Sequence, residues 1–317
     1  MTAPLDAFGR HRRLLFSVAY QMLGSVADAE DVVQDAWLRW SAADRSDVLD
    51  ERAYLVRIAS RLALDRMDSA RARRESYVGP WLPEPLLTGS SPVAAAPQEA
   101  QPEDAAELGE QVSLALLVVL ETLSPAERAV FVLREVFGFD FPEVASALGR
   151  SEAACRQLAV RARRHMHEGR PRFEADRRER EKLAERFFDA FKSGDVDGLR
   201  GLLAADVRMV GDGGGKAPQW RNGIFGADNV ARVLTAIVDP MLKIGVVVEP
   251  HEVNGEPGAI FRDRDNKVVN TWTLDILDGQ IQTIRAVLNP DKLAHVGPVA
   301  DAWAVMREAT QARRAQD

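Results

Sequence analysis

The segment over residues 79–109 constrains the fold most, because a helix cannot continue through it. Its first residues include four helix breakers, Gly79, Pro80, Pro83 and Pro85. Residues 88–102 are rich in Ser, Ala, Pro and Gln, a composition that cannot bury enough apolar surface to fold alone. The chain of 317 residues must therefore fold as separate modules on either side of a linker, and its length fits two or three domains.

The charges of the chain are segregated along the sequence, although the net charge is -7. Residues 52–74 hold seven arginines, and residues 150–180 hold ten arginines against five acidic residues. Residues 82–112 hold six acidic residues and no Lys or Arg. Because a nucleic-acid-binding domain usually carries a basic surface, this pattern predicts two basic modules joined by an acidic tether.

The composition is that of a soluble globular protein, with 46% hydrophobic and 28% charged residues. No apolar run reaches the length of a membrane helix, and no hydrophobic stretch of the signal-peptide kind follows residues 1–13. We therefore expect a cytoplasmic protein without membrane contact. Its single cysteine, Cys155, can form neither an internal disulfide nor a zinc site, so we expect no metal and no cofactor.

Two modules are expected to be helical. In residues 14–74, apolar residues recur at helical spacing in two groups: Val33, Trp37 and Trp40, then Leu55, Ile58 and Leu62. Helical patterning resumes at residues 110–123. The sequence Ser124-Pro125-Ala126-Glu127 then gives a helix start, with a capping hydroxyl, a proline at the first helical position and a carboxylate three residues after the cap. A short helix over 141–148 ends at Gly149, and Ser151 can cap an arginine-rich helix over 152–167, which predicts a helix-turn-helix unit.

The remainder of the chain is expected to form an α+β domain. A helix containing Leu183 and Phe187 precedes β-rich segments at 207–210, 243–248, 259–262, 268–277 and 281–288. Turns are predicted at Asn254-Gly255, Asp265-Asn266 and Asp278-Gly279, and further helices at 227–238 and 299–316. The predicted fold class is multidomain: two all-α domains, the second a helix-turn-helix, and a C-terminal α+β cone-like domain. The expected boundaries are 1–78, 79–109 for the linker, 110–175 and 176–317.

An acidic helical face is predicted within residues 28–40. Asp28, Asp31 and Asp35 are spaced at i, i+3 and i+7, opposite the stripe of Val33 and Trp40. Such a face can dock on a basic partner helix, and the alternative is an ordinary solvated surface.

Three blocks in order resemble the extracytoplasmic-function (ECF) class of RNA polymerase sigma factors: residues 28–40, 52–66, and 123–135 with 141–149. The resemblance implies that the chain directs the polymerase core to promoters. It implies contacts with the clamp helices of the β′ subunit through Asp28, Asp31, Gln34 and Asp35, and with the flap of the β subunit. For the minus-10 element of promoter DNA it implies Arg57, Arg61, Asp65, Arg66 and Arg71. For the minus-35 element it implies Ser151, Glu152, Arg156, Gln157, Arg161 and Arg164. Arg61 departs from the class, in which asparagine is usual at this position.

Three further strings resemble the branch of this class that carries a fused SnoaL-like (polyketide-cyclase, NTF2-like) domain. The strings are Trp81-Leu82-Pro83-Glu84-Pro85, Asp212-Gly213-Gly214-Gly215-Lys216 and Asn289-Pro290-Asp291-Lys292-Leu293. The resemblance implies that the C-terminal domain regulates the sigma factor within the same chain, and that the free protein is a monomer. Glycines permit close backbone approach, and Lys216 is expected to pair with Glu84 in the linker. A phosphate-binding loop is the weaker alternative for the glycines, since the Ser/Thr of a P-loop is missing.

The third domain has candidates for a ligand pocket. Enzymes of this shape use an Asp, His or Tyr as acid or base, and the residues expected to line a cavity here are Asp206, His251, Arg262, Trp272 and Asp275. We expect a small-molecule ligand rather than catalysis at this place. Two other functions stay open: a helix-turn-helix repressor with a sensor domain, and an isomerase or cyclase that carries DNA-binding modules.

Overall fold

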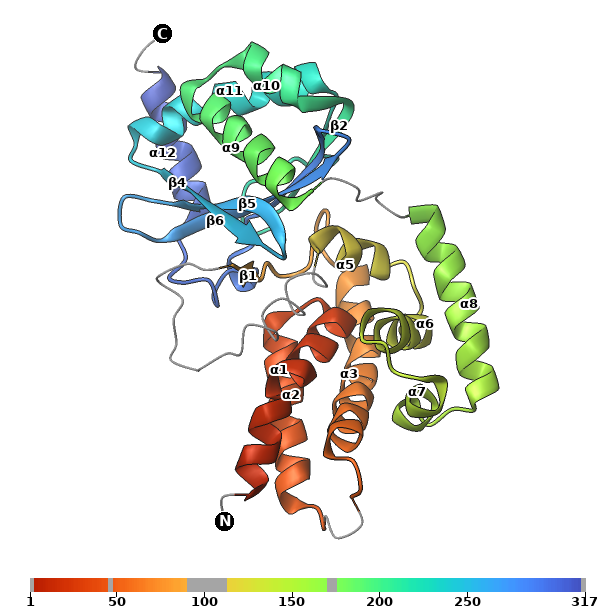
Figure 1. Cartoon of the computed structure of the whole chain (residues 1–317). Coiled ribbons are helices and arrows are strands. Elements are labelled where there is room, and N and C mark those ends of the chain that lie inside the picture. The colour runs from red at the N-terminus through yellow and green to blue at the C-terminus, as the bar shows by residue number, and fades with distance from the viewer. Residues whose placement is uncertain (1–2, 45–47, 90–112, 170–175, 315–317) are drawn as a thin grey trace. The chain divides into compact units, whose positions relative to one another are not determined.

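The computed structural model describes residues 3–44, 48–89, 113–169 and 176–314. Its contacts divide the chain into two compact units (Figure 1). The helical unit comprises residues 1–76 and 116–170, and the C-terminal unit comprises 77–115 and 171–317. The division falls within helix α5 (Leu114–Leu120). None of the helices in the described ranges is long and apolar enough to cross a membrane.

The first half of the helical unit is built from α1 (Ala3–Leu23), α2 (Val26–Ala42) and α3 (Glu51–Glu75), which pack against one another. Caps fix two of the helix starts, because Ser25 Oγ accepts from the Asp28 amide (3.1 Å) and Asp50 Oδ1 accepts from the Ala53 amide (3.0 Å). The predicted apolar stripes are buried except for Trp37, which is half-buried, and Trp40 is only 1% exposed. The expected all-α character of this region is confirmed.

The second half contains α6 (Pro125–Phe131), a π-helical turn η1 (Val132–Val136), α7 (Phe141–Leu148) and α8 (Glu152–Gly169). The predicted capping box between Ser124 and Glu127 is present. Gly149 ends α7 with φ 64°, a left-handed conformation that glycine adopts without steric cost. Helices α7 and α8 form the helix-turn-helix that the sequence predicted.

Contacts within the helical unit join its two halves. The buried Arg128 of α6 donates from Nε to the carbonyl of Gln21 in α1 (3.0 Å). Helix α3 also packs against α6 and α7. The Arg128 side chain is only 1% exposed, and its Nη1 pairs with Glu121, so this buried charge has an acidic partner.

The C-terminal unit is a sheet covered by helices. The helices are α9 (Arg177–Ser193), α10 (Val196–Leu202), α11 (Ala227–Lys243) and α12 (Ala302–Arg314). The strands are β1 (Leu87–Thr88), β2 (Leu203–Asp212), β3 (Ile224–Phe225), β4 (Val247–Val253), β5 (Glu256–Arg262), β6 (Val268–Leu277) and β7 (Gln280–Val287). They lie in the order β1-β4-β5-β6-β7-β2-β3, antiparallel except for the parallel pair β2–β7.

The turns between these strands follow the predicted chemistry. Asn254 and Gly255, and Asp278 and Gly279, all have positive φ and close two-residue hairpins between antiparallel strands. The C-terminal unit has the α+β architecture that was expected.

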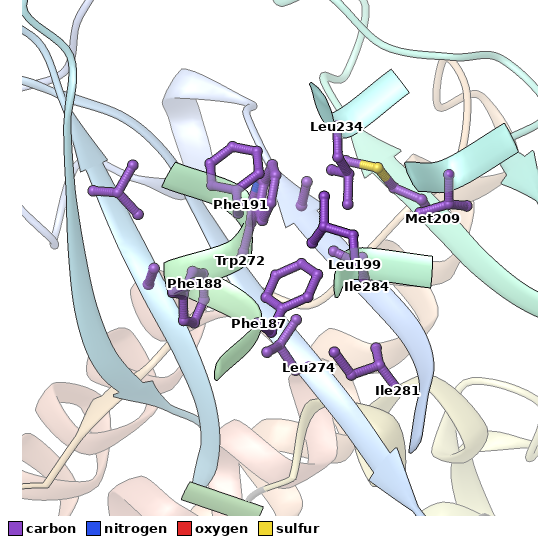
Figure 2. Close-up of a cluster of buried hydrophobic side chains, with 14 of the residues drawn as sticks. Phe187, Phe188, Phe191, Leu199, Met209, Leu234, Trp272, Leu274, Ile281 and Ile284 are labelled. Atoms are coloured by element: carbon purple, nitrogen blue, oxygen red, sulfur yellow. The ribbon is translucent and has the colours of Figure 1, made fainter. Parts of the chain in front are cut away.

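Aromatic side chains fill the space between the sheet and its helices (Figure 2). Phe191 of α9 lies 5.1 Å from Trp272 and 6.0 Å from Phe261, measured between ring centroids. Trp272, which we expected to line a cavity, is 2% exposed and belongs to this core. The prediction for Trp272 is therefore wrong: its ring packs on other rings.

Candidate nucleic-acid interface and linker contact

The acidic face of α2 is only partly open to solvent. Asp31 and Gln34 are exposed, whereas Asp28 and Asp35 are half-buried. Asp35 accepts a hydrogen bond from Arg66 of α3 (2.7 Å). One candidate for the polymerase contact is thus paired with one candidate for the minus-10 contact, and Asp31 and Gln34 are the residues that face outward.

The minus-10 candidates on α3 are partly engaged inside the helical unit. Arg57 stacks over the ring of Tyr54 (4.8 Å to the centroid), and Asp65 is exposed. Arg61 donates to two carbonyls in the last turn of α7, Ser146 O (3.1 Å) and Ala147 O (3.0 Å). A cation is favourable at this end of a helix because the carbonyls there carry partial negative charge. The side chain of Arg71 lies outside the described residues.

Helix α8 presents most of the minus-35 candidates on its open side. Ser151 caps the helix by accepting from the Ala154 amide (3.2 Å), and Glu152, Arg156, Gln157 and Arg164 are exposed. Arg161 is exposed as well, and its Nε donates to Glu127 of α6 (3.0 Å).

Glu127 is the anionic partner for this part of α8. Burial works against its ionisation, but hydrogen bonds from Ser124 and Arg161 outweigh that cost and hold the pKa of Glu127 below its ordinary value. The carboxylate is thus ionised and fixes the Arg161 guanidinium at its Nε end.

The start of the linker is held by a buried ionic cluster in the C-terminal unit. Asp212 at the end of β2, which is 0% exposed, accepts from the Leu82 amide (2.7 Å) and from the Tyr77 hydroxyl (2.5 Å). Lys292 Nζ donates to Asp212 (2.7 Å) and to the Leu82 carbonyl (2.5 Å). We call the cluster formed by Tyr77, Trp81, Leu82, Asp212, Asn289 and Lys292 the linker clasp.

Aromatic rings complete the linker clasp. The Lys292 ammonium lies 4.1 Å from the ring centroid of Trp81 and 4.7 Å from that of Tyr77. The Tyr77 hydroxyl also accepts from Asn289 Nδ2 (2.7 Å). Burial, followed by the hydrogen bond to Asp212, raises the pKa of Tyr77 far above its ordinary value, so the phenol stays protonated and donates to the carboxylate.

Beyond the linker clasp, the linker adds a strand to the sheet. Leu87 pairs with Val253 and Thr88 with Glu252, so that β1 lies on the edge of β4. Asn254 binds both backbone groups of Leu86. Its amide donates to the Leu86 carbonyl (2.7 Å), and its side-chain Oδ1 accepts from the Leu86 amide (2.9 Å). His295 contacts the Pro85 carbonyl (2.6 Å). The part of the predicted acidic tether within residues 90–112 lies outside the described residues.

The glycine loop after β2 lies against the linker clasp. Gly214 has φ 57°, and a Cβ there would come within 2.4 Å of Asn289 Nδ2 and 2.7 Å of the Tyr77 hydroxyl. The expected pair between Lys216 and Glu84 is wrong: Lys216 pairs with Asp291 (2.5 Å), and both side chains are exposed. The lysine that contacts the linker is Lys292. It lies on the turn η2 (Pro290–Lys292), and its Nζ donates to the Leu82 carbonyl.

The candidate catalytic residues do not gather around one cavity. Asp206 is exposed on β2, Arg262 pairs with Glu249 (2.9 Å), and Asp275 pairs with Arg285. His251 lines a pocket of about 450 Å³ beside α9, and none of the other four candidates lines it. In the described ranges, no group of three or more His, Cys, Asp or Glu side chains could hold a metal ion.

Sequence reasoning missed several residues of the linker contact, among them Tyr77, Asn254 and His295. Asn254 was recognised as a turn former, but its second function as a partner of the linker backbone needs the fold. Tyr77 precedes the recognised string by four positions and carries no signal of its own.

Known proteins are similar to this chain in sequence and in fold. Family models for sigma-70 region 2 and sigma-70 region 4 match residues 7–73 and 113–166. The ECF RNA polymerase sigma factor SigJ of Mycobacterium tuberculosis is 38% identical over 302 residues, which cover 91% of this chain and 92% of SigJ. The probable ECF sigma factor SigI of the same species is 34% identical over 295 residues, covering 92% of this chain and 95% of SigI.

The crystal structure of Mycobacterium tuberculosis SigJ superposes with a TM-score of 0.71 at 34% identity, covering 95% of this chain and 100% of that chain. The match therefore covers the C-terminal unit as well as the helical unit, which contains most of the two sigma-70 regions. This chain belongs to the family of extracytoplasmic-function RNA polymerase sigma factors.

Proposed function

We propose that this ECF sigma factor directs the RNA polymerase core to specific promoters, and that the hold of its C-terminal unit on the linker regulates this activity. The observation that carries the regulatory part is the linker clasp, in which a buried Lys292–Asp212 pair binds both the amide and the carbonyl of Leu82. Backbone recognition of this kind fixes one short stretch of the linker on the C-terminal unit.

For the polymerase contact we propose the outward side of α2, with Asp31 and Gln34 as the residues that meet the β′ clamp helices. Both are exposed, and Asp28 lies one turn before them. Asp35 would join this contact only when it leaves Arg66. The helix-turn-helix region would contact the flap of the β subunit.

For promoter DNA we propose two surfaces. Residues near the start of α8 would read minus-35 bases, because the first turns of a recognition helix reach base edges, and later arginines such as Arg164 would bind phosphates. The arginines of α3 would contact the minus-10 region, where they offer both charge and stacking planes to unpaired bases. Arg61 must exchange the α7 carbonyls for DNA in order to take part.

For regulation we propose that the linker clasp holds residues 77–88 on the C-terminal unit in the resting protein. Tyr77 follows the end of α3 by two residues, so a linker held there also limits how far region 2 can move from the C-terminal unit. Release of the linker clasp would let the acidic linker enter the positively charged channels of the polymerase. This regulation within one chain would take the place of a separate anti-sigma protein.

We propose that the C-terminal unit is a regulator and has no catalytic activity. Aromatic and aliphatic side chains fill the interior between the sheet and its helices, as Figure 2 shows for Phe187, Phe191 and Trp272. The pocket that His251 lines remains the place for a small-molecule ligand. The free protein would be a monomer, and it would act in the cytoplasm because its partner there is RNA polymerase.

Charge reversal on α2 tests the proposed polymerase contact. We expect Asp31→Lys to weaken binding to purified core polymerase at least tenfold, since a like charge placed in an interface costs several kcal/mol. Asp265→Lys, on an exposed turn of the C-terminal unit, is the matched control and should bind as the wild type does. Equal affinity for the two variants would contradict the proposed contact, while a loss in both would indicate a general charge effect.

A further inference from the structure

A π-helical turn, η1, ends the helix that precedes the helix-turn-helix. In η1 the Phe137 amide donates to the Val132 carbonyl five residues earlier (3.1 Å), and the Phe139 amide donates to the Leu133 carbonyl (3.0 Å). The π-helical turn is rare, and its single turns occur most often at functional sites. Nothing in the sequence pattern predicted this turn.

The side chain that this turn presents is Arg134. Its Nη1 donates to the Phe139 carbonyl (2.8 Å), and its guanidinium lies 4.9 Å from the ring centroid of Phe141 at the start of α7. The hydrogen bond fixes the guanidinium against the loop, and the ring gives it a cation–π contact. Arg134 therefore joins the turn to the first residue of α7.

The same ring holds a second arginine, which comes from the recognition helix. The Arg156 guanidinium lies 4.4 Å from the Phe141 centroid, and Arg156 Nη2 donates to Glu152 one turn earlier (3.2 Å). The two cations on one ring repel each other, and the Glu152 carboxylate offsets part of that repulsion at Arg156. Arg156 is 58% exposed, so its position depends on these two contacts.

We propose that Phe141, supported by Arg134, is a positioning residue that sets the direction of Arg156 for reading a base in the minus-35 element. The proposal rests on the proposed function of α8 as the reader of that element. Arginine recognises guanine through two parallel hydrogen bonds, and this contact requires a well-defined guanidinium orientation. A free arginine side chain would lose rotamer freedom on binding, whereas one already held on a ring has lost part of it beforehand.

The position of Arg156 favours a base over a phosphate. It lies four residues after the first residue of α8, in the stretch from which recognition helices reach base edges. Arg156 has an acidic partner in Glu152, and so do two arginines further along α8: Arg161 pairs with Glu127 (3.0 Å) and Arg163 with Glu135 (2.7 Å). Arg156 differs from these two because it also lies over an aromatic ring.

Selection from a promoter library tests the proposal with intact holoenzyme. Core polymerase loaded with full-length protein would be presented with promoters randomised in the minus-35 element, and the bound sequences would be counted. We expect Phe141→Leu and Arg134→Gln to lower the preference at one or two base positions about five- to tenfold, the order expected for a weakened bidentate contact. These should be the same positions that Arg156→Ala affects. Phe141→Tyr keeps the ring and should keep the wild-type profile.

Arg163→Gln is the matched control on the same helix. It removes a charge that Glu135 holds, and it should lower binding to all sequences by a similar factor without changing the base preference. Arg134→Gln also guards against misfolding, because Arg134 is not part of the apolar core and the variant leaves the Phe141 side chain itself unchanged.

Three results would overturn the proposal. If Arg156→Ala changes the profile while Phe141→Leu and Arg134→Gln leave it unchanged or weaken all sequences equally, the ring has no positioning role. If Arg156→Ala leaves the profile unchanged while the wild type still selects sequences, Arg156 reads no base. If the wild-type holoenzyme selects no minus-35 sequence, the proposed function of α8 fails, and the inference fails with it.

Discussion

Removing the charge of Lys292 is the sharpest test of the linker clasp. Lys292→Met keeps most of the apolar stem but deletes the ammonium that binds Asp212 and the Leu82 carbonyl. The side chains of the pair are 8% and 0% exposed, so the carboxylate would be left buried without its cation. We expect this change to release the linker.

The free-energy cost of Lys292→Met depends on the contacts that Asp212 keeps. Loss of one partner of a buried ion pair costs about 3–5 kcal/mol. Asp212 keeps its hydrogen bonds from the Leu82 amide (2.7 Å) and the Tyr77 hydroxyl (2.5 Å), which places the expected cost at the lower end. A loss of about 3 kcal/mol corresponds to a roughly hundredfold shift of the docking equilibrium towards the released linker.

Hydrogen exchange at the Leu82 amide is the direct measurement, because this amide donates to Asp212 in the docked state. Its protection should fall about a hundredfold in Lys292→Met, while amides of β6 and β7 stay protected. Lys216→Met is the control: Lys216 and Asp291 are 56% and 63% exposed, and such a pair contributes about 0–1 kcal/mol. Unchanged protection of Leu82 in Lys292→Met, or equal effects of the two variants, would refute the reasoning.

Three further predictions concern other parts of the structure. Arg61→Asn removes two hydrogen bonds to the α7 carbonyls, and exchange of the α7 amides should rise about tenfold, whereas a shift confined to α3 would contradict the contact. Burial raises the pKa of Glu256 from 4.5 to about 7. Its protonated form therefore adds roughly 3 kcal/mol to the free energy of unfolding below pH 4.5, and this contribution is lost as the pH rises to about 7. Denaturant unfolding of Glu256→Gln should therefore vary less with pH over that range than that of the wild type. Gly214→Ala places a Cβ 2.4 Å from Asn289 Nδ2 at φ 57°, and Leu82 exchange should rise in this variant but not in Gly201→Ala, where a Cβ meets open space.

Local sequence chemistry accounts for much of the fold. The capping box at Ser124 and Glu127 and the left-handed Gly149 fix helix ends with contacts between near neighbours. The hairpins at Asn254-Gly255 and Asp278-Gly279 follow from residues that tolerate positive φ. Such features depend on a few adjacent residues, so the sequence reveals them before any tertiary contact is known. The resemblance to sigma factors likewise depended on ordered strings of local sequence.

The partners of charged side chains were decided by the tertiary structure. Both Lys216 and Lys292 lie in recognised strings, yet only Lys292 is buried against the linker, 210 residues away from Leu82 in sequence. Arg61 is held by α7 although its sequence surroundings indicated DNA. A long flexible side chain can reach several partners, and which one it meets depends on how distant elements pack.

The sequence by itself determined where the helices and hairpins form and which protein family the chain belongs to, because short-range hydrogen bonding and apolar periodicity encode these features. Only the tertiary structure decided that the linker adds strand β1 to a sheet edge and that a buried lysine holds its backbone. The physical reason is that such contacts join segments over 100 residues apart, whose meeting is set by strand register and core packing rather than by any local pattern.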